Sequence, residues 1–310
     1  MADSFLTVAQ NVLTLFILIF VGVACGKWKL LNDTAVKACA NLVLYIATPC
    51  VIVKSCIREF DATMLWDFLI VAAAAVVNHL VLILVARLVF RDSDENRRRV
   101  LRFATIFANA GYMALPLQQA VLGDKGVFYC AAYIMVFNII MWTYGILEIG
   151  GDQVKFSPKS LINPGTIGVV VGLIIFLLSV PVPTLVSDAI GHLGNLNTPV
   201  PMVIIGYYLG QTDLRTALRD KRSYVCIALR LVVMPLLALA ALLLCGVRGD
   251  VLTSCMICIS TPVATATTMM ATRYDRNPLL SVNLVSVSTL LSMVTMPLII
   301  ALSTWLSSVL

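Results

Sequence analysis

Two hydrophobic segments, in matching places of the two halves of the chain, combine a proline with small and polar residues. The first segment is residues 103–116 and ends at Pro116; the second is residues 255–265 and contains Pro262. Proline interrupts helical hydrogen bonding, and free backbone groups at bilayer depth are tolerated only inside protein or beside a water-filled cavity. Paired breaks of this kind mark binding sites in secondary transporters.

The chemistry that such breaks support is anion binding. An interrupted helix presents unpaired N–H groups and a positive dipole end, and these ends bind anions. Asn109 adds a neutral amide donor, which favours a carboxylate without the desolvation cost of a buried charge. Gly111 permits close approach of the backbone. The alternative for Asn109 is an interhelical hydrogen bond that only holds helices together.

We therefore predict a substrate-binding site at the two breaks. The predicted site residues are Asn109, Gly111, Tyr112, Pro116, Thr261, Pro262 and Thr265, with Asn138, Cys50 and Lys54 as further candidates. No cofactor and no metal site are expected.

Other polar residues within apolar stretches have a functional and a structural interpretation. Lys54 can attract an anion or extend to the membrane surface. Arg230 either reaches the cytoplasmic surface or pairs with Glu148. His79 either carries protons or is a hydrogen-bonded structural histidine, and the structural role is favoured. Asn138 is placed where it can face the breaks.

The composition predicts an all-α membrane protein. The mean hydropathy is +0.96, and 60% of residues are hydrophobic while 12% are charged. About 20 apolar residues cross the hydrocarbon core. Ten transmembrane helices are predicted, over residues 6–26, 36–53, 66–89, 101–123, 127–147, 164–180, 193–209, 223–245, 251–272 and 279–306. The first is kept as mature structure, because residues 1–4 lack the basic start of a signal peptide.

The distribution of charge predicts the orientation. The formal net charge is +6, and most lysines and arginines lie in loops that follow odd-numbered spans, whereas the opposite side has only Lys54, Arg58, Lys125 and Arg248. By the positive-inside rule the richer side is cytoplasmic, which places both termini outside an inner (plasma) membrane. We interpret the basic stretch at 92–99 as a topology determinant rather than a nucleic-acid or lipid-binding segment.

Nine cysteines, mostly within the spans, do not form the pattern of a disulfide framework. Cys255 and Cys258 have the spacing of a thiol motif but lie in an apolar helix, so packing is the favoured interpretation.

A weak internal repeat predicts an inverted architecture of five plus five helices. Three features recur in the same order: a small-xxx-small pair, a Thr-Pro dipeptide and the helix-breaking proline. They are Gly22–Gly26 and Gly168–Gly172, Thr48-Pro49 and Thr198-Pro199, and Pro116 and Pro262. Because five is odd, repeating the block inverts it in the membrane.

Together these elements resemble the auxin efflux carrier family, which includes plant auxin exporters and bacterial permeases for malate or malonate. The resemblance rests on the motif at 109–117, the motif at 261–265 followed by 271–275, and the five-plus-five organisation. The loop at 150–163 is short, as in the bacterial branch.

The resemblance implies a scaffold (residues 1–65 and 163–215), a transport domain (66–149 and 216–310) and a cytoplasmic linker (150–162). It implies homodimers through the scaffold, and crossing of broken helices four and nine. It also implies that Asn109 contacts the substrate carboxylate and that Pro262 is the crossover proline. A second asparagine of some plant carriers has no match; the polar candidates there are Thr261, Thr265 and Thr267.

The predicted function is efflux or exchange of a small organic carboxylate, such as malate, malonate or an auxin-like acid, by elevator-type alternating access. The expected partners are this anion, the lipid bilayer and a second copy, with no nucleic acid. The runner-up is a sodium-coupled symporter of the bile-acid type, with sodium held by oxygens such as those of Ser260 and Thr261. Sodium–proton antiporters share the broken-helix geometry but need carboxylates at the crossing, and neither segment contains Asp or Glu. Catalytic motifs of intramembrane enzymes are absent from the sequence.

Overall fold

A computed structural model of the protein describes residues 2–154, 162–211 and 220–309. All regular structure in these residues is helical, as the composition predicted. Their one β interaction is an isolated antiparallel bridge between Ala108 and Val263.

The first half of the chain forms helices with three π-helical turns. Its elements are α1 (Ala2–Lys27), α2 (Asp33–Leu42), η1 (Val43–Ala47), α3 (Thr48–Cys56), α4 (Ala62–Val89), α5 (Glu95–Ile106), η2 (Ala110–Ala114), α6 (Leu115–Ile140), η3 (Met141–Gly145), α7 (Ile146–Gly150) and the 3₁₀ turn η4 (Gly151–Gln153). At Gly123, inside α6, φ is 62°, a conformation that glycine adopts without strain. The helix therefore has two arms.

The second half of the chain also consists of helices and contains a π-helical turn. Its elements are α8 (Pro164–Leu177), α9 (Thr184–Asn195), α10 (Pro199–Gly210), α12 (Lys221–Ala228), η6 (Leu229–Val233), α13 (Met234–Leu244), α14 (Gly249–Ile259), α15 (Ala266–Arg273) and α16 (Pro278–Val309). The predicted span 193–209 is therefore two helices, because α9 starts earlier and a turn separates it from α10.

Six helical stretches are long and apolar enough to cross a membrane. They are Gln10–Lys27, Asp33–Cys56, Ala62–Val89, Ala110–Gly150, Lys221–Leu244 and Pro278–Val309, and two shorter apolar helices are Pro164–Leu177 and Gly249–Ile259. Exposed large apolar side chains, such as Leu84 (58%) and Leu244 (89%), cover much of their outer faces. Lipid is the solvent that such faces require.

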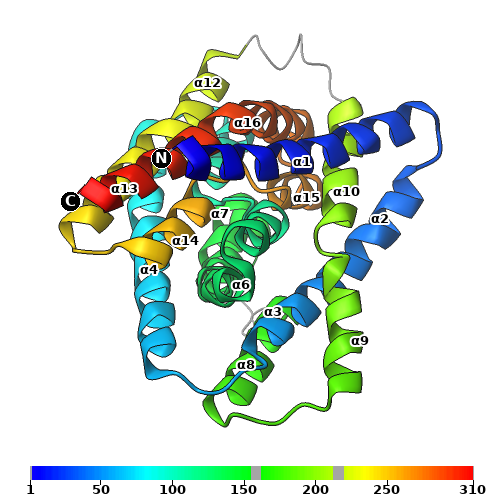
Figure 1. The fold of residues 1–310 in the computed structure, drawn as a ribbon. Coiled ribbons are helices and arrows are strands. Elements are labelled where there is room, and N and C mark those ends of the chain that lie inside the picture. The colour runs from blue at the N-terminus through cyan, green and yellow to red at the C-terminus, as the bar shows by residue number, and fades with distance from the viewer. Residues whose placement is uncertain (1, 155–161, 212–219, 310) are drawn as a thin grey trace.

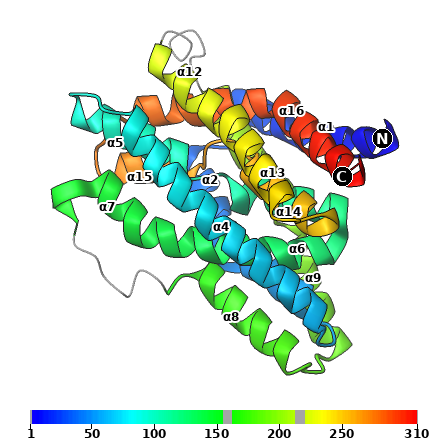
Figure 2. The same ribbon diagram turned by 90° about the vertical axis from the view of Figure 1, so that its left-hand side faces the viewer.

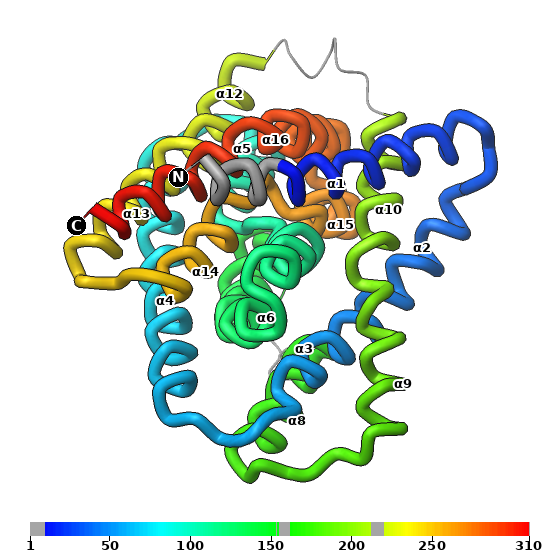
Figure 3. Tube along the Cα trace, viewed as in Figure 1, coloured from blue at the N-terminus to red at the C-terminus, as the bar shows by residue number. Residues whose placement is uncertain are grey.

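The helices lie on either side of α6, which Figure 1 shows nearly end-on. Helices α2, α3, α9 and α10 lie on one side and α4, α13 and α14 on the other, and the tube in Figure 3 follows the same path along the chain. Helix α1 contacts both α10 and α16. The two chain ends lie at the same edge of the molecule in both Figure 1 and Figure 2.

Two helix pairs are in backbone contact. A Cβ added to Gly206 of α10 would lie 1.9 Å from the Ile19 carbonyl oxygen of α1, and one added to Gly168 of α8 would lie 2.9 Å from Cα of Pro49 on α3. Only glycine allows these approaches.

Ion pairs connect separate helices at several places. Arg97 pairs with Asp220, and Arg222 Nη1 lies 2.9 Å from Asp92 Oδ2. These contacts connect the start of α5 with the start of α12.

Elsewhere, Lys125 Nζ lies 2.9 Å from Asp250 Oδ2. All nine cysteines are free thiols, and Cys255 and Cys258 are buried. Most of the predicted linker, 150–162, and the predicted boundary at 215/216 lie outside the described residues.

Candidate functional site: two joined helix breaks

Both helix breaks predicted from the sequence exist, and they meet. Residues 107–109 separate α5 from η2, and residues 260–265 separate α14 from α15. The Asn109 N–H donates to the Pro262 carbonyl oxygen at 2.9 Å, and the Ala264 N–H donates to the Phe107 carbonyl oxygen at 3.0 Å. Backbone groups that the helices leave unpaired are thus satisfied by each other. We call this pair of breaks the crossing.

The sequence explains why α14 stops. Pro262 has no N–H to continue the helix. Just before it, the Ser260 hydroxyl donates to the Met256 carbonyl at 2.6 Å and the Thr261 hydroxyl donates to the Cys258 carbonyl at 2.9 Å. Side chains that bond back to the last turn compete with helix propagation. From the side, the Ser288 hydroxyl of α16 accepts the Val263 N–H at 3.1 Å.

Asn109 holds the most distinctive group at the crossing. It is 3% exposed, and its side-chain Nδ2 is buried with no hydrogen-bond partner among the described residues. Buried polar groups are normally satisfied, so an unpaired amide donor suggests a ligand or water at this position.

The flank of the crossing beside Asn109 is open. Gly111, Tyr112 and Thr265 are partly exposed, in contrast to the buried residues around them. A Cβ added to Gly111 would meet nothing within 4 Å. Because η2 contacts α10, Gly111 belongs to a turn that neighbours the α1–α10 side of the molecule.

Arg230 neither reaches the cytoplasmic surface nor pairs with Glu148, which were the two structural interpretations from the sequence. It lies in the π-helical turn η6 and is 0% exposed, so it does not reach the surface. Its Nη2 donates to the Ile259 carbonyl at 2.7 Å and its Nε to the Thr261 carbonyl at 3.2 Å, while its Nη1 has no partner among the described residues. Its predicted partner Glu148 instead lies 3.3 Å from Arg102.

The contacts of Arg230 have an electrostatic consequence. The carbonyl end of a helix carries a partial negative charge, which would repel an anion at the crossing. Arg230 places a guanidinium at this end of α14. The sequence marked Arg230 as an unusual intramembrane charge, but its partners are main-chain carbonyls that no side-chain pattern identifies.

Pro116 does not lie at the break, contrary to the prediction. The break precedes it at 107–109, and Pro116 occupies the first turn of α6 after the π-helical turn η2. The helix runs on from η2 through Pro116 into α6, and the π-helical turn before Pro116 is the kind of irregularity that accommodates a missing proline N–H. Pro262 alone therefore interrupts a helix.

The other predicted site residues divide into two groups. Thr261 and Thr265 flank Pro262, and the Thr261 hydroxyl is already bonded, as described above. Lys54 lies away from the crossing, with its Nζ 2.6 Å from the Ser187 hydroxyl of α9. Cys50 is a half-buried residue of α3.

Asn138 packs between helices: its Nδ2 would lie 3.0 Å from a Cβ on Gly165 of α8. His79 is fully buried, and its Nδ1 lies 2.7 Å from the Ala75 carbonyl. Its Nε2 has no partner in the described part of the chain. The hydrogen-bonded structural role favoured from the sequence fits these contacts.

Comparison with known proteins identifies the family. Residues 7–300 match the family described as membrane transport protein. The chain belongs to the membrane transport protein family. This is the auxin efflux carrier family that the motifs resembled, so the resemblance is confirmed at the family level.

Two archaeal relatives span nearly the same length. An uncharacterized transporter of Methanothermobacter thermautotrophicus is 22% identical over 299 residues, covering 95% of this chain and 98% of the relative. One of Methanocaldococcus jannaschii is 21% identical over 310 residues, covering 95% and 97%. Family membership makes the protein a multi-pass membrane transporter and not an enzyme, and it leaves the substrate open.

Proposed function

We propose that the protein is a secondary transporter that moves a small organic carboxylate, such as malate, malonate or an auxin-like acid, across an inner (plasma) membrane by efflux or exchange. The observation that carries this proposal is the crossing: two helix breaks joined backbone to backbone, with the unpaired, buried amide Nδ2 of Asn109 beside an open flank.

The charges at the crossing favour an anion. The helix starts of η2 and α15 direct N–H groups toward it, and Arg230 offsets the carbonyl end of α14. Residues 107–109 and 260–265 contain no Asp or Glu. A cation would therefore find no carboxylate in either break, whereas a carboxylate would find an amide donor, helix starts and a nearby guanidinium.

Ten spans in two inverted repeats account for the packing. In this arrangement α1 corresponds to α8, and the α3 segment corresponds to α10. The contact of α1 with α10 is then the counterpart of the contact of α8 with α3, and both use the glycines of the repeated motif. The hydroxyl of Thr48 donates to Asn197 Oδ1 at 2.7 Å, which joins the two Thr-Pro sites of the repeat.

An elevator mechanism follows from this division. Helices α1, α2, α3, α8, α9 and α10 would form a scaffold that dimerises with a second copy, and the remaining helices, which carry the crossing, would move against it. The open flank beside Gly111 lies at this boundary, so movement would expose it to one side and then the other. With the basic end cytoplasmic, both termini lie outside.

The membrane potential favours outward transport of an anion. A monoanion leaving a cell with an interior potential of −100 mV gains ~2.3 kcal/mol, which corresponds to about fiftyfold in concentration. Efflux or exchange is therefore favoured over uptake without coupling. Sodium coupling is the alternative, with Ser260 and Thr261 as oxygen donors.

The test is uptake of labelled malate by proteoliposomes under an imposed, inside-positive potential, with and without sodium and a proton gradient. We expect sodium-independent uptake that Asn109→Ala lowers by about tenfold or more, the value of a hydrogen bond to a charged group. Asn41→Ala changes an exposed asparagine of α2 and is the matched control.

Equal uptake by Asn109→Ala and the native protein would remove Asn109 from the site, and strict sodium dependence would favour the symporter alternative. If malate is not carried, the same assay with malonate, monocarboxylates and auxins identifies the acid. Absence of transport for the whole panel would contradict the carboxylate proposal.

A further inference from the structure

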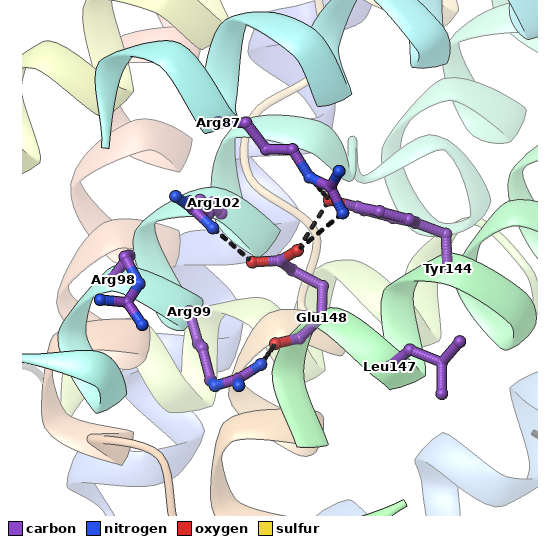
Figure 4. A pocket seen from close by; sticks show the side chains of 7 residues that line it. All are labelled: Arg87, Arg98, Arg99, Arg102, Tyr144, Leu147 and Glu148. Carbon is purple, nitrogen blue, oxygen red and sulfur yellow. Dashed lines mark hydrogen bonds and ion pairs between the residues drawn. The ribbon is translucent and has the colours of Figure 1, made fainter. Parts of the chain in front are cut away.

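A pocket of about 340 Å³ lies among the first turns of α5 and its neighbours, and none of its lining residues belongs to the proposed transport site. Its lining residues are Arg87, Arg98, Arg99, Arg102, Tyr144, Leu147 and Glu148, drawn in Figure 4. They come from the end of α4, the first turns of α5, and η3 with α7. The volume is at the lower limit for small-molecule sites, which suits a headgroup rather than a large ligand.

Glu148 organises the pocket but does not neutralise it. Its carboxylate lies 3.3 Å from Arg102 Nη1 and 3.9 Å from Arg87 Nη2, and accepts a hydrogen bond from the Tyr144 hydroxyl at 2.7 Å. Arg99 donates to the Glu148 main-chain carbonyl at 2.5 Å. Figure 4 shows three of the arginines directed at this one residue.

The charge that remains is positive. Arg99 also pairs with Glu95 at 2.7 Å, and this hydrogen bond lowers the pKa of the Glu95 carboxyl, which stays ionised. Four guanidinium groups thus face two carboxylates. Arg98 is the one without an ion pair among the described residues; its Nη1 donates to the Asp92 main-chain carbonyl at 2.7 Å.

The surroundings of the pocket are apolar on one side. Leu147 is 42% exposed, and Leu84 and Leu88 of α4 are 58% and 54% exposed in the turns beside Arg87. An arginine cluster next to a lipid-facing helix end has the layout of an interfacial site, with acyl chains on the leucines and a headgroup on the guanidinium groups.

We propose that this pocket binds the phosphate headgroup of an anionic phospholipid. Arginine is suited to phosphate because its planar fork donates two parallel hydrogen bonds, and all four cations of the pocket are arginines. The sequence alone favoured a topology role for the stretch at 92–99. The pocket adds a second role, because two of these arginines, together with Arg102 of the same helix, converge with Arg87 from the end of α4.

Native mass spectrometry of the purified full-length protein tests the site. The probes are dioleoyl phosphatidylglycerol and dioleoyl phosphatidylcholine, added separately to detergent-solubilised protein. We expect tighter binding of phosphatidylglycerol, and about fivefold weaker binding of it by Arg98→Gln, the effect of one interfacial basic residue. Arg98→Lys keeps the charge and should retain most of the binding.

Arg91→Gln is the matched control, because Arg91 is exposed, lies in the loop that precedes α5 and does not line the pocket. Equal binding of the two lipids, or equal weakening by Arg91→Gln and Arg98→Gln, would overturn the proposal. Displacement of the lipid by glycerol 3-phosphate at similar concentration would overturn the lipid assignment in favour of a soluble phosphate ligand. Malate transport plays no part in these measurements.

Discussion

The two helix breaks meet each other but are held very differently. The break at 260–265 has supports from outside its own helices: Arg230 on its carbonyls, Ser288 on the Val263 N–H, and its pairing with residues 107–109. Within the part of the chain that the structure describes, the break at 107–109 has only that pairing as a hydrogen-bonded support from another helix, and it keeps an unpaired amide on Asn109. The break at 260–265 is thus the rigid support of the crossing, and the break at 107–109 is the side open to a ligand.

This difference matters because a transport site must be rigid and yet incompletely satisfied. A fully paired crossing would offer nothing to a substrate, while an unsupported one would lose its geometry. The chain separates these requirements between its two halves, so its inverted repeat is not symmetric in chemistry. Changes at the break 260–265 and its supports should therefore affect transport more than changes at the open flank.

Arg230→Met is expected to have the largest effect. It removes the guanidinium that offsets the carbonyl end of α14 and leaves the Ile259 and Thr261 carbonyls without their donor. We expect substrate affinity in proteoliposome transport to fall by about thirtyfold or more, as for loss of one partner of a buried charged contact.

Arg230→Lys is the control for charge and should recover part of the affinity. Size-exclusion chromatography of both variants checks that they fold. If Arg230→Met keeps the native substrate affinity, anion binding does not require a cation at the carbonyl end of α14.

Pro262→Ala comes next in expected effect. The restored N–H and relaxed φ allow α14 to continue through the break, which would disturb the pairing with Asn109. We expect the transport rate to fall by about tenfold, measured as initial uptake, with no loss of thermal stability.

Pro116→Ala is the matched substitution in the other half, and we expect it to change the rate by less than about twofold because Pro116 lies beyond the break, in a helix that already runs from η2 into α6. Equal loss in both variants would restore the equivalence of the two prolines that the sequence suggested.

Gly111→Ala probes the open flank. The added methyl group meets no atom within 4 Å, so the fold should accept it, at a helix-start position where alanine is favourable. We expect KM to rise about two- to fivefold, with larger acids affected more than small ones and the maximal rate little changed. An unchanged KM for every acid would place the substrate away from this flank.

Lys54→Gln should have the smallest effect. The lysine bonds to Ser187 within the predicted scaffold, and a partly exposed polar contact contributes little. Transport rate and KM should stay within about twofold of the native values. A larger change in KM would return Lys54 to the substrate site proposed from the sequence.

Much of the fold was predictable because its signals are local. Apolar runs mark the helices, and segments that combine a proline with small and polar residues mark both breaks, although only Pro262 itself lies in one. The start of the predicted span 193–209 differs from the structure: glycines such as Gly191 and Gly194 lower the hydropathy of α9, which begins at Thr184. The predicted span 101–123 ends at Gly123, and there α6 bends.

The sequence by itself determined that this is an all-helical membrane protein with two interrupted segments and a strong charge asymmetry, since hydropathy, proline and charge act within a few residues of their own position. Only the tertiary structure decided what those features contact. Arg230 bonds carbonyls some 30 residues away, Asn109 keeps a free amide, and four arginines from two regions share one pocket. These depend on three-dimensional packing, in which main-chain carbonyls and empty space are partners that no sequence motif encodes.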